Sequence, residues 1–101
     1  MKPIVKVEGK TGTILLIGQF DFNVHKDFRA ASQELLENAE VSNIDVNFEQ
    51  VPYLDSSALG MLLLLRDYAG GEKAQVEVIN SNNDVRKILA ISNFDKLFAI
   101  S

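Results

Sequence analysis

Residues 55–68 read DSSALGMLLLLRDY, and this stretch decides the fold. It opens with residue types that commonly cap helices, continues apolar nearly all round, and is followed by Gly70 and Gly71, which stop helices. We therefore expect a buried helix here, in the middle of the chain. Met61 and Leu62 are expected to belong to its core-facing side.

The chain before this helix predicts a hairpin, a helix and a strand. Residues 4–7 and 13–20 are rich in β-forming residues and flank a glycine-containing turn, which is typical of a hairpin. Residues 44–48 alternate apolar and polar side chains, which indicates a strand. Between them, Asn23 is expected to cap a helix whose other face, including His25, is wet. The apolar positions of that helix, at spacings of three and four, are Val24, Phe28, Ala31, Leu35 and Ala39.

The chain after the central helix predicts one more strand and one more helix. Residues 75–80 contain the β-branched pattern of a strand, and Ser81 or Asn82 is expected to cap the helix that follows. Asn93 is expected at the end of that helix, and the apolar tail 97–100 is expected to pack back on the domain. The positions expected to be buried in this last helix are Val85, Ile88, Leu89 and Ile91.

This order of elements predicts an α/β fold. Two strands open the chain and are followed by alternating helices and strands, so we expect a mixed β-sheet with an N-terminal antiparallel hairpin, parallel strands after it, and helices packed on the sheet. No internal repeat or long linker divides the sequence. Residues 1–101 are therefore expected to form a single domain.

Composition narrows the range of functions. The chain has 101 residues, of which 47% are apolar, and no cysteine, so a core without disulfides or thiol chemistry is expected in a reducing cytoplasm. The net charge of −4 and the scattered cations disfavour nucleic-acid binding, which needs a basic face. The longest apolar run, residues 61–65, is far too short to span a membrane, and the start has no secretory pattern. A monomer is expected, because no coiled-coil seam is present.

Asp55, Ser56 and Ser57 are the first candidates for a functional site. Ser and Asp are common helix caps, so one interpretation is capping alone. The other is that Ser56 is exposed at a helix N-terminus, where backbone N–H groups and the helix dipole can hold an added phosphate. A catalytic serine would need a general base, and the only histidine, His25, is placed on a wet helix face. We therefore do not expect a serine hydrolase.

The sequence lacks the motifs of nucleotide and metal binding. Neither the Gly-x-Gly-x-x-Gly pattern nor a Gly-Lys-Ser/Thr phosphate loop is present in the sequence. Asp21, His25 and Asp27 are neighbours in sequence, but charges at a helix start are ordinarily solvated, so no metal site is expected. No cofactor is expected.

Asp21 is the second candidate residue. As a turn or capping carboxylate it needs no further role. Yet Asp21 and Asp55 each follow a predicted strand and precede a predicted helix. Because such junctions gather at the carboxyl ends of parallel strands, where α/β proteins place their sites, a binding role is the alternative.

Two segments resemble a known family. Leu54-Asp55-Ser56-Ser57-Ala58-Leu59-Gly60, opening an apolar helix, and Gly18-Gln19-Phe20-Asp21, ending the second strand, resemble a STAS domain of the bacterial anti-sigma-factor antagonist type. The resemblance extends over nearly the whole chain. One departure is Ala58, where the family often has glycine; alanine is a good helix former and is expected to be tolerated.

The resemblance implies a function without catalysis. It implies that Ser56, directly after the aspartate, is phosphorylated, that Ser57 is a structural hydroxyl, and that Asp21, Asp55, Ser56 and Ser57 contact a partner. The partner implied is an anti-sigma factor that is also a serine kinase, or a related signalling regulator, bound only by the unphosphorylated protein. A PP2C-type serine phosphatase is implied to reverse the modification. The alternative is a STAS accessory subunit that docks independently of phosphorylation, such as those of lipid-transporting ABC systems.

Overall fold

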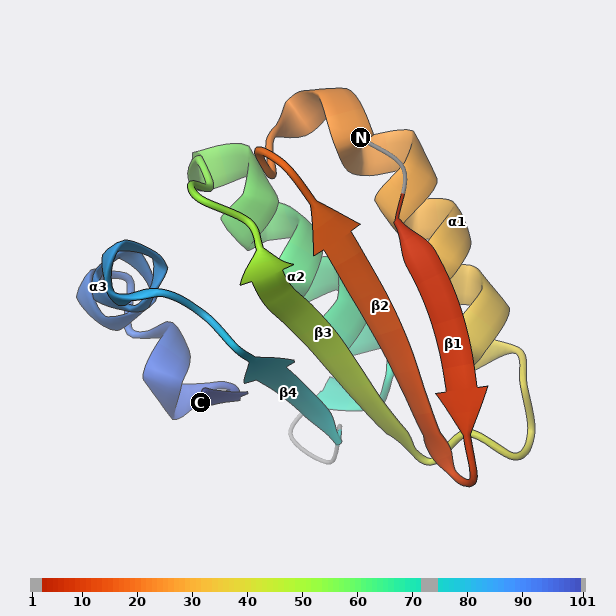
Figure 1. The fold of residues 1–101 in the computed structure, drawn as a ribbon. Coiled ribbons are helices and arrows are strands. Elements are labelled where there is room, and N and C mark those ends of the chain that lie inside the picture. The colour runs from red at the N-terminus through yellow and green to blue at the C-terminus, as the bar shows by residue number, and fades with distance from the viewer. Residues whose placement is uncertain (1–2, 72–74, 101) are drawn as a thin grey trace.

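One five-stranded sheet forms the centre of the computed structural model, which describes residues 3–71 and 75–100 (Figure 1). The strands lie in the order of the sequence, β1-β2-β3-β4-β5. β1 and β2 pair antiparallel, and every later pair is parallel, which confirms the predicted mixed sheet with its N-terminal hairpin. The strands are β1 (Ile4–Glu8), β2 (Thr11–Ile17), β3 (Asn43–Gln50), β4 (Val76–Ile79) and β5 (Ala99–Ile100).

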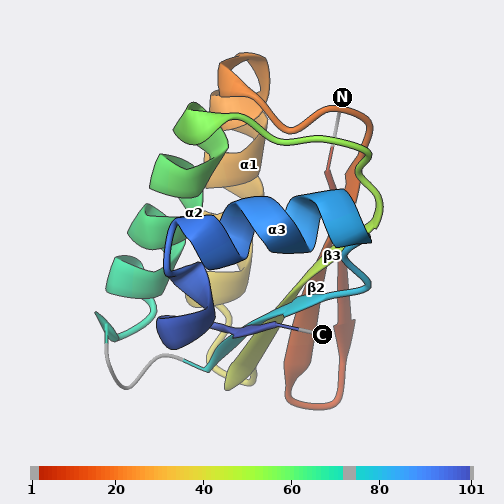
Figure 2. The ribbon, with the colours of Figure 1, turned by 90° about the vertical axis from the view of Figure 1, so that its left-hand side faces the viewer.

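Three α-helices complete the fold of the described residues. α1 (His25–Leu36) and α2 (Ser56–Tyr68) lie side by side on one face of the sheet and run in the same direction (Figures 1 and 2). α3 (Asn83–Ile91) lies on the β4–β5 side of the sheet, and the short turn η3 (Phe94–Lys96) leads into β5 (Figure 1). The apolar tail therefore packs on the domain as expected, and part of it forms the fifth strand. None of the helices in the described ranges combines the length and the apolar character needed to cross a membrane.

The core lies between the sheet and the α1–α2 pair. Ile14 in β2 faces Val46 in β3 across the parallel ladder, and both are completely buried. Alternate residues point to opposite faces of a strand, so their neighbours Thr13 and Asp45 lie on the face that α1 and α2 leave uncovered. The regular alternation of these strands is why the sequence could predict them.

The first helix begins and ends differently from the prediction. Asp21, not Asn23, is the cap, and it caps a 3-10 turn, η1 (Phe22–Val24), that precedes α1. The Asp21 carboxylate accepts a hydrogen bond from the backbone N–H of Asn23 at 2.9 Å, so the turn starts two residues earlier than expected. At the other end α1 stops at Leu36, and Ala39 is exposed, contrary to the prediction.

Two further predictions of burial were wrong. α2 is not buried all round, because α1 and the sheet cover only part of it: the exposed fraction is 54% for Leu64 and 60% for Tyr68. Met61 and Leu62 are buried, as predicted. In α3, Ile91 is 82% exposed, because it lies about 200° around the helix from buried Leu89 and so points to the opposite side.

Asn82 is the cap of α3, one of the two residues predicted for that role. Its side chain accepts a hydrogen bond from the backbone N–H of Val85 at 2.8 Å and donates one to the carbonyl of Val51 at 3.2 Å. The second bond ties the start of α3 to the segment between β3 and α2. Asn93 follows the end of α3 in the left-handed conformation, which asparagine tolerates better than most residues.

Candidate functional site

Two loops at the carboxyl ends of β2 and β3 are held together by an isolated parallel bridge. Phe20 and Leu54 form this bridge: the Phe20 N–H donates to the carbonyl of Tyr53 at 3.1 Å, and the Asp55 N–H donates to the carbonyl of Phe20 at 3.2 Å. Asp21 and Asp55 each follow a bridge residue directly. The structure therefore brings these two aspartates together at one edge of the sheet.

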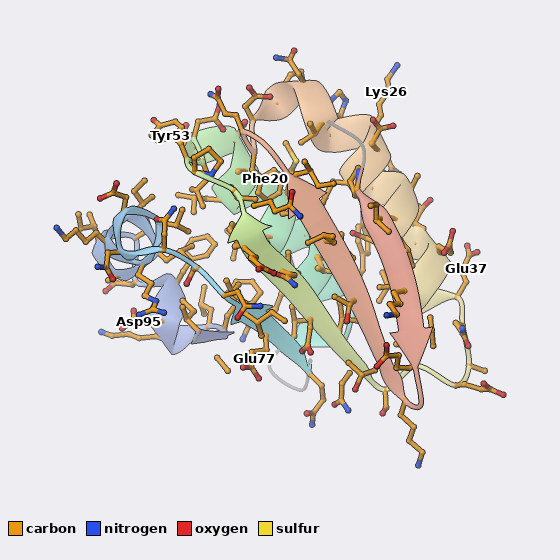
Figure 3. All side chains as sticks on the ribbon, viewed as in Figure 1. Phe20, Lys26, Glu37, Tyr53, Glu77 and Asp95 are labelled. Carbon is orange, nitrogen blue, oxygen red and sulfur yellow. The ribbon has the colours of Figure 1, made fainter. Side chains whose placement is uncertain are left out.

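The buried side chain of Phe20 anchors the bridged loops to the core. Its side chain is completely buried, with ring centroids 5.1 Å from Phe28 in α1 and 5.9 Å from Phe48 in β3. The ring therefore packs against α1 and β3, while its backbone is bonded to the loop before α2. Figure 3 shows Phe20 between the ends of the strands, and Tyr53 beyond the end of β3.

Asp55 is the N-cap of α2. Its carboxylate accepts hydrogen bonds from the Ser57 hydroxyl at 2.5 Å and from the Ala58 backbone N–H at 3.1 Å. The Ser57 hydroxyl is the main reason that the pKa of Asp55 lies below its usual value; partial desolvation opposes this shift, and the Ala58 N–H adds to it. Asp55 therefore places a negative charge at the helix start at neutral pH.

The two serines differ in what their hydroxyls do. Ser57 is half-buried and its hydroxyl is engaged by Asp55. Ser56 is the first residue of α2, it is exposed, and its hydroxyl makes no hydrogen bond to any residue in the described ranges. A group added to Ser56 would project into solvent beside the N–H groups and positive dipole end of a 13-residue helix.

Exposed aromatic side chains flank this site. Phe22 is 62% exposed and Tyr53 is 50% exposed, one on each of the two bridged loops. Aromatic side chains that remain exposed next to polar groups are common in protein interfaces. The Asp21 carboxylate, half-buried beside Phe22, has the local capping role described above.

His25 is not placed to activate either serine. Its ring stacks on Phe22 with centroids 4.3 Å apart, and Nδ1 lies 2.8 Å from the Phe22 carbonyl oxygen. It is half-buried, so this position is less solvated than the predicted wet face. Within residues 3–71 and 75–100 no hydrogen bond links His25 to Ser56 or Ser57, and no three acidic, histidine or cysteine side chains are grouped as metal ligands.

Comparison with known proteins decides the family. A family model described as "Mlab, STAS domain" matches residues 5–99. The chain belongs to the STAS-domain family. A STAS-domain containing protein of Pseudomonas aeruginosa (strain UCBPP-PA14) is 52% identical over 94 residues, which cover 93% of this chain and 91% of that protein.

Solved structures share the fold of this STAS domain at low sequence identity. The Bacillus cell fate determinant SpoIIAA, an anti-sigma factor antagonist, is 22% identical, and its phosphorylated form superposes with a TM-score of 0.73 over 98% of this chain and 90% of that one. Its unphosphorylated form gives a TM-score of 0.74 over 98% and 86%. A putative anti-sigma factor antagonist of Thermotoga maritima is 16% identical, with a TM-score of 0.85 over 97% and 84%.

One surface feature of this STAS domain was not predicted. A groove of about 150 Å³ lies between α1 and α2, next to the exposed side chains of Leu64 and Tyr68. The sequence contains one signal for it: Leu64 and Tyr68 are four residues apart and so share a helix face. That signal is obscured because apolar residues occur on every face of α2.

Proposed function

We propose that this STAS domain is a partner switch controlled by phosphorylation of Ser56, acting as an anti-sigma-factor antagonist in the cytoplasm. The observation that supports it best is the contrast between the two serines. Ser57 is engaged in the helix cap, whereas Ser56 is exposed with a hydroxyl that the fold does not use. Phosphate can therefore be added to Ser56 without breaking a contact of the fold.

The electrostatic consequence of a phosphate is large enough for switching. Phosphoserine adds a charge of about −1.5 to −2 next to ionised Asp55 and close to Asp21. A charge of about −2 at about 6 Å from a partner carboxylate, with an effective dielectric constant of about 20, gives about 5 kcal/mol of repulsion before salt screening. Half of that value weakens binding about a hundredfold.

The same site explains why release needs no change of fold. Asp55 and Ser57 form the helix cap without Ser56, so α2 keeps its start in either state. SpoIIAA has been solved in both forms, and each superposes on this chain with nearly the same TM-score. The proposed partners are an anti-sigma factor with serine kinase activity, or a related regulator, and a PP2C-type phosphatase; the domain itself has no proposed catalytic role.

A binding comparison of single-residue variants tests the proposal. Protein from the native cells is passed over immobilised wild-type, Ser56→Glu and Ser56→Ala domains, and the proteins retained by the wild type are identified and titrated. We expect Ser56→Glu to weaken binding of the anti-sigma factor about tenfold or more, because one added carboxylate gives about half the repulsion of phosphate. Ser56→Ala should bind like the wild type. Equal binding of Ser56→Glu and wild type contradicts the switch.

A second candidate is a docking subunit that does not respond to phosphorylation, such as an accessory subunit of an ABC-type lipid transporter. The groove between α1 and α2 favours it for a partner that presents no carboxylate near Ser56, because Ser56 does not line that groove. The same titration separates the two functions. A transporter component that binds wild type and Ser56→Glu equally supports the second one.

A further inference from the structure

The groove between α1 and α2 has an apolar floor and a partly exposed wall. Phe28, Met61 and Leu65 line it and are buried, whereas Leu64 and Tyr68 line it and are more than half exposed. We call the groove lined by these five side chains and Arg29 the α1–α2 groove. Exposed leucine and tyrosine beside an apolar floor make a surface that gains free energy when it is covered.

Apart from the Tyr68 hydroxyl, the polar side chains that line the groove come from α1: His25, Arg29, Ser32 and Gln33. The Ser32 hydroxyl lines the groove but is already bonded to the Phe28 carbonyl at 2.8 Å. Arg29 also lines it, is exposed, and makes no ion pair within residues 3–71 and 75–100. The charge available to an occupant is therefore positive, although the whole chain has a net charge of −4.

The size and shape of the groove limit which kinds of ligand can occupy it. About 150 Å³ is below the range of roughly 300–1,000 Å³ typical of small-molecule sites, but it accepts one or two apolar side chains. The groove is bordered by two helices that run side by side, so a helix can lie along it with apolar residues at i, i+3 or i+4, and i+7 (Figure 2). A second copy of the chain would carry the same net charge of −4, and this like charge disfavours self-association.

We propose that the α1–α2 groove receives an amphipathic helix of the partner protein, whose apolar side chains enter the groove and whose flanking carboxylate pairs with Arg29. This inference deepens the proposed switch and, for its link to phosphorylation, rests on it. Met61 lies five residues after Ser56, or about 7.5 Å along the axis of α2. A partner carboxylate at the near end of the groove is therefore close enough to be repelled by phosphate on Ser56, while Arg29 attracts it in the unmodified protein.

Two synthetic 18-residue helical peptides test the groove without any assumption about Ser56. Both have the same leucine stripe, and one has glutamate and the other lysine on each side of it. They are titrated into the isotope-labelled full chain at physiological ionic strength and followed by NMR. We expect the glutamate peptide to shift the backbone amide signals of α1 and α2 around the groove, and to bind several-fold more tightly than the lysine peptide.

Matched variants locate the contacts. Leu64→Ser should raise the Kd of the glutamate peptide about tenfold, and Arg29→Glu about fivefold. Ile91→Ser and Lys87→Glu make comparable changes, apolar to serine and cation to glutamate, at exposed positions of α3 and should leave the Kd unchanged. Circular dichroism of each variant checks that the fold is retained. No saturable binding, equal binding of the lysine peptide, or shifts confined to α3 or the uncovered sheet face would overturn the inference.

Ser56→Glu completes the test. It should weaken binding of the glutamate peptide and leave the lysine peptide unweakened. If the groove binds as described but Ser56→Glu has no effect, the link to phosphorylation is wrong and the groove assignment stands. If the partner titration responds to Ser56→Glu while the glutamate peptide does not bind, the groove assignment is wrong and the switch stands.

Discussion

At the scale of single residues, the Ser57 hydroxyl differs from that of Ser56 by one hydrogen bond, which it donates to Asp55. Replacing Ser57 with alanine removes the main cause of the low pKa of Asp55, so that pKa should rise toward its ordinary value. A carboxyl with a depressed pKa adds stability above its unfolded-state pKa and loses it as the pH falls through the folded-state value. Ser57→Ala should therefore lack this contribution to stability at neutral pH, and the difference in stability between wild type and Ser57→Ala should shrink as the pH falls below the unfolded-state pKa of about 3.9. Carboxyl ¹³C NMR titration measures the shift, and an unchanged Asp55 titration would refute the account of this cap.

Asp45 has the opposite shift. It lies on the uncovered face of the sheet, in register with Glu77 of β4, and its pKa is raised, first by burial and then by the charge of Glu77. A raised carboxyl pKa means that the folded state loses stability as the pH rises from the unfolded-state value, about 3.9, through the folded-state one. Asp45→Asn should therefore raise the Tm at pH 7, and the gain should shrink toward zero near pH 3. Thermal unfolding at both pH values measures this; an equal gain at both would show that charge is not the cause.

The sequence predicts some of these residue roles and not others. The pairing of Asp21 and Asp55 follows from strand–helix junctions, which local pattern reveals. The choice between Ser56 and Ser57 came from the family resemblance, because two adjacent hydroxyls at a helix start look alike in sequence. The structure separates them by their exposure and by the orientation of the Ser57 hydroxyl toward Asp55, and both depend on backbone geometry at the cap.

At the scale of elements, α2 contains a glycine that the fold does not require. Gly60 is exposed, and a Cβ atom added there would meet nothing within 4 Å. Gly60→Ala should stabilise the domain by up to about 1 kcal/mol, measured by urea unfolding. Gly12→Ala provides the contrast, because its Cβ would lie 2.5 Å from a methyl carbon of fully buried Leu35. A loss of stability in Gly60→Ala would contradict the packing described for α2.

The order and type of the main elements were predictable, since alternation and helical spacing are local properties. The errors occurred where a neighbour decides the outcome. The start of the first helical segment depends on the hydrogen bond from the Asn23 N–H to the Asp21 side chain. The exposed side of α2 is the part of its surface that α1 and the sheet do not cover. The last strand, β5, is two residues long and is defined by its parallel pairing with the backbone of β4.

At the scale of the whole molecule, the account predicts that modification changes the surface and leaves the fold intact. Ser56→Glu should shift the free energy of unfolding by about 1 kcal/mol or less, because the cap formed by Asp55 and Ser57 persists. Equilibrium unfolding of Ser56→Glu and wild type in parallel measures this. A loss of several kcal/mol would mean that weakened partner binding reflects unfolding and not repulsion.

The most direct test of the central claim is intact-mass spectrometry with site mapping on protein isolated from its native cells under two growth conditions. The account predicts a single phosphate whose occupancy changes with condition and which maps to Ser56. Phosphate on Ser57 alone would contradict the assignment of the two serines, and protein that stays unmodified under varied conditions would contradict the switch.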